Sequence, residues 1–286
     1  MLRKRTELAP RRALPRWLPA LALAGIVAAA VLPKPYYVQT AGFARDAEPL
    51  IRVGTAAGTG AAGEAAAREG PAWLYTAVKL ERASLLQAAY AELTGRGDAR
   101  AVRAVLGGET EDAYRKRMDE AMRQALLEAA RAAAGEAERG WIEEIREETP
   151  EPERGAPRSE PDSRPIGRVV GDGSSEPIRL GPAGAGGPSA GLMAALSLYD
   201  RLTPEADLLG GRRIAGTGTM DAEGRIGAVG GVGRKAEAAS AAGADLFVAP
   251  KAEAGEAAEA ARRAGGGMMI VGADSLGEAV DLLRQR

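Results

Sequence analysis

The chain has 286 residues, with 38 basic and 39 acidic side chains, no histidine and no cysteine. The lack of histidine excludes Ser-His-Asp catalysis and histidine-ligated zinc, and the lack of cysteine excludes thiolate nucleophiles, disulfides and thiolate metal sites. Any catalysis must therefore use Ser, Thr, Lys, Tyr, Asp or Glu side chains. The net charge of -1 gives no reason to expect a nucleic-acid partner. The length predicts about two folded units.

The N-terminal segment predicts export. Residues 1–16 form a basic tail with six positive side chains and one acidic one, and residues 17–32 contain no charge. This pattern is typical of a membrane-directed segment whose basic end stays in the cytoplasm. We expect 17–32 to be a single-pass anchor, because the run is longer than an ordinary signal-peptide core and is bounded by Trp17 and by Tyr36 and Tyr37. A cleaved signal peptide is the alternative, and both place the remaining chain outside the cytoplasm.

Residues 33–80 are expected to be a short extended region, with strands at 36–39 and 73–80. Between these strands, Gly58–Gly63 matches the G-x-G-x-x-G pattern of dinucleotide-binding folds. No repeated strand-helix unit surrounds the match, and export would separate it from the cytosolic nicotinamide pool. We therefore interpret Gly58–Gly63 as a flexible loop and expect no cofactor, with nucleotide binding as an alternative hypothesis.

Residues 81–148 are predicted to be helical, because apolar residues recur there at three- and four-residue spacing. Breaks at 94–98 and 107–108, with Thr110 as an N-cap, divide this region into two or three helices. Residues 149–165 carry five prolines among charged residues and are predicted to be a disordered linker.

Residues 166–286 are predicted to form a compact α/β domain. Helix and strand alternate in its second half, which is typical of parallel strands with covering helices. We expect a turn at Asp221–Gly224 in which the glycine adopts a positive φ. The expected strands are 213–220, 225–229, 245–250 and 268–271, and the expected helices are 234–242, 253–263 and 276–285.

Ser189 is the candidate nucleophile. It lies in Gly187-Pro188-Ser189-Ala190-Gly191, where the proline suits a helix start and would place the serine in the first turn. Backbone N–H groups at a helix start can stabilise the negative charge that develops when a serine attacks a carbonyl. We expect Gly187, Pro188 and Ala190 to form this oxyanion site.

The serine needs a base other than histidine. G-x-S-x-G is also the nucleophile elbow of α/β-hydrolases, but that family needs a histidine. A desolvated lysine can take the role, because burial lowers its pKa and the free amine can accept a proton. Of the six lysines, Lys235 is the best candidate, since it follows a glycine-rich loop in an alanine-rich setting. Lys79 and Lys251 stay open as alternatives.

These motifs resemble the proteolytic domain of Lon-type Ser/Lys proteases. The resemblance rests on Gly187–Gly191, on Thr217-Gly218, on Gly230–Lys235 and on the 46 residues that separate Ser189 from the lysine. It implies that Ser189 is the nucleophile, that Lys235 is the general base and that Thr217 supports the dyad through its hydroxyl. It also implies that the domain hydrolyses peptide bonds in protein substrates and forms a homo-oligomer, for which a ring is one form.

The whole chain is similar to membrane-anchored, ATP-independent Lon-like proteases of bacteria. No G-x-x-x-x-G-K-[ST] phosphate loop is present in the sequence. The PDZ stretch that this group usually carries is also missing, because the helical region passes straight into the linker. The resulting prediction is an ATP-independent serine endopeptidase with an extracytoplasmic catalytic domain and no metal. The alternative is a catalytically silent Lon-fold assembly module at the membrane.

Overall fold

The computed structural model describes residues 34–53, 70–137, 142–143, 167–171, 174–181 and 187–285, together with a few positions between 17 and 25. The predicted basic tail, the glycine motif at Gly58–Gly63 and the linker at 149–165 lie outside the described residues, as does most of the apolar run. Within the described parts of the chain, no helix is both long and apolar enough to cross a membrane.

The chain divides into two compact units. The larger unit comprises residues 39–80 and 106–286, and the smaller one comprises residues 1–38 and 81–105. The strands β1 (Tyr36–Asp46) and β3 (Ala72–Ala83) contribute residues to both units. The expected strands at 36–39 and 73–80 are thus confirmed, but they are longer than predicted.

A mostly parallel sheet is the centre of the larger unit, with the strand order β12-β11-β8-β3-β1. Its other strands are β8 (Arg213–Gly216), β11 (Leu246–Pro250) and β12 (Met269–Ala273). The register is parallel from β3 to β12, with Leu74 opposite Ala215, Ala215 opposite Phe247, and Phe247 opposite Ile270. The predicted α/β class with parallel strands is confirmed. β8 pairs with β3, which lies upstream of the predicted domain start at residue 166.

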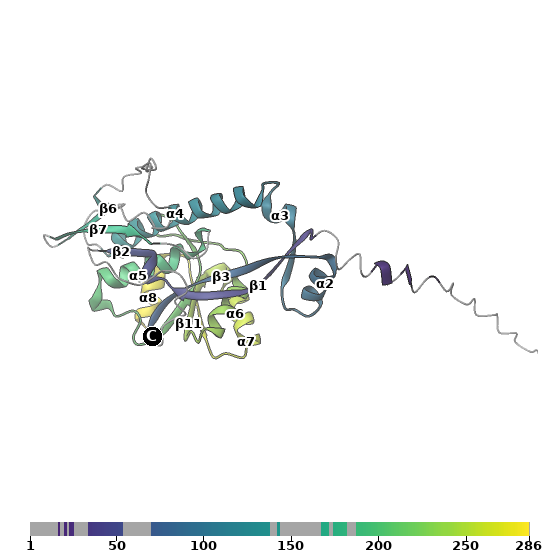
Figure 1. Ribbon diagram of the computed structural model, residues 1–286. Coiled ribbons are helices and arrows are strands. Elements are labelled where there is room, and N and C mark those ends of the chain that lie inside the picture. Colours follow the sequence, from purple (N-terminus) through teal and green to yellow (C-terminus); the bar gives the residue numbers. More distant parts are fainter. Residues whose placement is uncertain are drawn as a thin grey trace, which may run out of the picture. The chain divides into compact units, whose positions relative to one another are not determined.

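Helices cover both faces of this sheet (Figure 1). Successive strand residues point to opposite faces, so Ile214 and Val248 pack into one apolar cluster while Ala215 and Phe247 pack into the other. The first cluster includes residues of α4 (Glu111–Glu136), α5 (Gly191–Leu202) and α8 (Leu276–Arg284). The second includes residues of α6 (Val232–Ala241) and α7 (Ala254–Arg263). The three helices predicted after residue 233 are therefore confirmed within a few residues at each end.

Two smaller sheets complete the larger unit. An antiparallel sheet has the order β2-β7-β6-β5, and β9 pairs with β10 in a short antiparallel ladder. The bounds are β2 (Ile51–Val53), β5 (Ile142–Glu143), β6 (Gly167–Gly171), β7 (Ser174–Leu180), β9 (Thr219–Met220) and β10 (Ile226–Gly227). The turn between β9 and β10 has Gly224 at φ +80°, as predicted. Short 3₁₀ turns are η1 (Glu48–Leu50), η2 (Pro188–Ala190), η3 (Pro204–Ala206) and η4 (Lys251–Glu253).

The region 81–148 is less helical than predicted. It contains α2 (Leu85–Leu93), α3 (Val102–Leu106) and α4, but β3 continues to Ala83 and β4 (Asp98–Ala101) interrupts the helices. In the sheet order β4 is the neighbour of β1, a tertiary pairing that local periodicity does not report. Thr110 caps α4 as predicted, since its hydroxyl accepts a hydrogen bond from the Ala113 amide at 3.2 Å.

Candidate active site

Ser189 lies in the 3₁₀ turn η2, directly before α5, and is partly exposed. The prediction placed it in the first turn at a helix start. In the structure this turn is a tighter 3₁₀ turn that begins at Pro188, and the Gly191 amide donates to the Pro188 carbonyl. Gly187 enters the turn at φ +106°, a conformation that residues with a Cβ rarely adopt.

Backbone hydrogen bonds hold the Ser189 turn from two sides. From α4, the Met118 carbonyl accepts the Gly187 amide at 2.8 Å. From the segment after β8, the Gly218 amide donates to the Ser189 carbonyl at 3.0 Å, and the Gly218 carbonyl accepts the Leu192 amide at 3.1 Å. The serine therefore sits on a fixed backbone at the start of a buried helix.

This geometry leaves fewer N–H groups available to an oxyanion than the sequence predicted. The Gly187 N–H is already donated to Met118, and Pro188 has no N–H. Of the three predicted residues, only Ala190 is therefore left as a donor on these two grounds. Ala190 itself is buried, with 2% of its surface exposed.

Lys235 and Thr217 are brought together in the interior. Lys235, on α6, is 3% exposed, and its Nζ donates to the Thr217 Oγ1 at 3.1 Å. The fully buried Thr217 in turn donates its hydroxyl to the Ser189 carbonyl at 3.1 Å. Three separate segments thus converge through one hydroxyl group. No hydrogen bond joins the Ser189 hydroxyl directly to Lys235 in the described part of the chain.

Burial gives Lys235 the electrostatics of a candidate base. Desolvation lowers its pKa from 10.5 to about 8, while the negative charge of Glu253 opposes this shift. Glu253 is placed by the loop before α6, since its carboxylate accepts the Val229 amide at 3.1 Å. At neutral pH about a tenth of Lys235 is then the free amine, which can accept a proton.

The alternative lysines lack this environment. Lys79 is exposed on β3. Lys251 is also exposed, and it pairs with Glu278 at 2.7 Å and Asp274 at 3.6 Å. The hydrogen bond and charge of Glu278 raise the pKa of Lys251, which favours its protonated form. Among the lysines that the structure describes, only Lys235 is buried.

Sequence reasoning did not find Met118 or Glu253. Met118 contributes a backbone carbonyl, for which no side-chain pattern exists, and Glu253 resembles the other acidic residues of the alanine-rich helices. Their roles depend on contacts between segments that are distant along the chain. No group of three or more acidic side chains that could hold a metal ion occurs within the described ranges.

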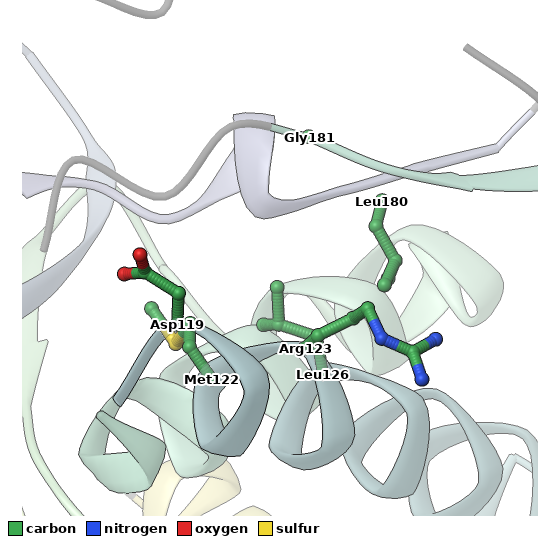
Figure 2. Close-up of a pocket in the computed structure, with 6 residues that line it drawn as sticks. All are labelled: Asp119, Met122, Arg123, Leu126, Leu180 and Gly181. Atoms are coloured by element: carbon green, nitrogen blue, oxygen red, sulfur yellow. The ribbon is translucent and has the colours of Figure 1, made fainter. Parts of the chain in front are cut away.

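A pocket of about 180 Å³ lies between α4 and the end of β7 (Figure 2). In Figure 2 four side chains of α4 line it from one side, opposite Leu180 and Gly181. The helix whose Met118 holds Gly187 therefore also borders this pocket. The α4 residues are Asp119, Met122, Arg123 and Leu126.

Comparison with known proteins assigns the C-terminal part of the chain. Residues 179–285 match the family model of the Lon protease (S16) C-terminal proteolytic domain. The match contains Ser189, Thr217 and Lys235, and also η2, α5 and the helices α6 to α8. No curated protein matches the chain. Residues 179–285 are thus similar to the proteolytic domain of Lon-type serine proteases of the S16 family.

Proposed function

We propose that the chain is an ATP-independent serine endopeptidase in which Ser189 is the nucleophile and Lys235 is the general base. The observation that carries this proposal is the buried Lys235 amine, with its lowered pKa, linked through Thr217 to the backbone of Ser189. A solvated lysine would stay protonated at neutral pH and could not act as a base.

In the proposed reaction, Lys235 takes the proton of the Ser189 hydroxyl as Oγ attacks the peptide carbonyl. The same proton then passes to the leaving amine, and an acyl-enzyme ester forms on Ser189. Lys235 next takes a proton from water, whose hydroxide attacks the ester and releases the new carboxyl end, and Lys235 returns this proton to the departing Ser189 Oγ. The Lys235 amine must contact the Ser189 hydroxyl for these steps, so the hydrogen bond to Thr217 has to be shared or exchanged. Catalytic hydrogen bonds often tighten only when substrate binds.

The proposal places the protease domain outside the cytoplasm, held at the membrane by residues 17–32. Its support is the uncharged run with basic residues before it and tyrosines after it. The substrates are then proteins or peptides at the outer membrane face. A homo-oligomer is part of the proposal. Few N–H donors for the oxyanion are described in the active site of one chain, and assembly can complete such a site.

The test is labelling of the full chain with a serine-reactive fluorophosphonate, followed by casein hydrolysis with and without ATP. We expect labelling and turnover in the wild type, no dependence on ATP, and loss of both in Ser189→Ala. Ser240→Ala, which removes another partly exposed serine, is the matched control and should retain both. Labelling that persists in Ser189→Ala would exclude this serine as the nucleophile.

A catalytically silent assembly module is the second candidate. The observation that favours it is the lack of a direct hydrogen bond between Ser189 and Lys235 among the described residues. It predicts a folded, oligomeric protein that neither labels nor hydrolyses casein.

A further inference from the structure

The helix α2, in the smaller unit, has an apolar face on the side opposite to its buried residues. Its buried side is formed by Ala88 and Ala91. At 100° per residue, five apolar side chains on the opposite side fall within an arc of about 140°. All five are exposed: Leu85 at 54%, Leu86 at 47%, Tyr90 at 55% and Leu93 at 88%, together with Ala89.

This face is unusual for the molecule. Apart from the N-terminal run, six large hydrophobic side chains are exposed among the described residues, and four of them lie on α2. Single exposed leucines need no explanation, whereas a contiguous apolar face marks an interaction surface. Such a face on a short helix fits either a protein partner or the boundary region of a lipid bilayer.

The path of the chain decides between these partners. Lys34 and Pro35, which follow the apolar run, are tied to the smaller unit by two hydrogen bonds. The Lys34 carbonyl accepts from the Arg82 guanidinium at 3.1 Å, and the Pro35 carbonyl accepts from the Val102 amide at 2.8 Å. Arg82 precedes Ser84, the N-cap of α2, by two residues.

The stretch of chain between the apolar run and the smaller unit is therefore short. The two residues from Leu32, the last of the run, to Lys34 span at most about 7 Å. An interfacial helix buries its apolar face about 5–10 Å into the boundary between headgroups and acyl chains. If residues 17–32 cross the bilayer, the start of α2 cannot be far from the membrane surface.

The charges around α2 suit anionic headgroups. Residues 34–38 and 81–105 contain five basic and three acidic side chains. Arg96, exposed just beyond the helix, donates to the Tyr90 hydroxyl at 3.2 Å and so places a cation at the edge of the apolar face. Arginine beside tyrosine and leucine is the composition of interfacial segments.

We propose that the exposed face of α2 rests in the outer leaflet of the membrane and fixes the smaller unit there as a second contact beside the anchor. This inference rests on the membrane attachment in the proposed function, but not on the peptidase chemistry. Its consequence is that the smaller unit would be held at the bilayer by two contacts instead of by the anchor alone.

The absence of cysteine makes the test direct, because one introduced cysteine is the only labelling site. Leu93→Cys, at a residue that is 88% exposed, is labelled with a polarity-sensitive fluorophore in the full chain. The labelled chain is reconstituted into phosphatidylcholine vesicles that contain phosphatidylglycerol. Ala252→Cys, at an exposed residue of the larger unit, is the matched control.

We expect the Leu93 probe to be quenched by lipids carrying a spin label high on the acyl chain and to be several-fold less accessible to iodide than the Ala252 probe. Equal iodide access at both sites, in a chain that floats with the vesicles, would overturn the proposal and leave the anchor intact. Protection from iodide without lipid quenching would show that protein covers the face, which also overturns it. A chain that does not float would refute the anchor and this contact together, while fluorophosphonate labelling would still report on the peptidase.

Discussion

Replacing Lys235 by Met should abolish activity and yet stabilise the fold at neutral pH. Lowering the pKa of a lysine from 10.5 to about 8 means that its protonated form costs about 3 kcal/mol in the folded state. Methionine has a similar length and carries no charge, so the substitution removes this cost. It also removes the hydrogen bond to Thr217, which contributes about 1 kcal/mol. The net expected gain is about 2 kcal/mol in the free energy of unfolding near pH 7.

The gain should depend on pH in a defined way. Between about 8 and 10.5, Lys235 has lost its proton in the folded protein but keeps it in the unfolded chain. The unfolded wild type therefore binds more protons in this window, and its stability rises with pH relative to Lys235→Met. The advantage of the variant should shrink through this window and become a small deficit above it, because only the lost hydrogen bond is left.

The assay is urea unfolding of the full chain in detergent micelles, with wild type and variant compared from about pH 7 to about pH 10.5. Other groups titrate over this range, but they cancel in the difference between the two proteins. Lys251→Met, at an exposed and ion-paired lysine, is the control and should show no gain at neutral pH. A Lys235→Met protein that is less stable than wild type by the same amount at every pH would refute the desolvated lysine.

Three further predictions concern activity. The wild-type kcat/KM for casein should rise about tenfold per pH unit below about 8 and then level off, because the proposed base is the neutral amine of Lys235; a flat profile would contradict this role. Glu253→Gln removes the charge that raises the pKa of Lys235, so the inflection of the same profile should move to lower pH, and Glu253→Asp should leave it nearly in place. Thr217→Val removes two hydrogen bonds and should lower kcat/KM by about tenfold, whereas Thr217→Ser should retain most activity; equal rates in both variants would show that the hydroxyl is unimportant.

Local patterns predicted much of the C-terminal half. Parallel strands, three covering helices and the turn at Gly224 follow from the alternation of apolar segments with glycine, and the structure contains them. The all-helical interpretation of residues 81–148 failed at β4, because a short strand forms only where a neighbouring strand supplies hydrogen bonds. Local patterns also did not indicate that β3, from far upstream, pairs with β8 of the C-terminal half.

The sequence by itself determined the kind of chemistry available to this protein. A serine in a glycine-rich turn, without any histidine or cysteine in the chain, led to the prediction of a lysine base. Only the tertiary structure decided which lysine is desolvated, because burial depends on α6 packing against the sheet and not on neighbouring residues. It also decided that the Gly187 amide is already bound to Met118, a contact between distant segments that no local spacing encodes.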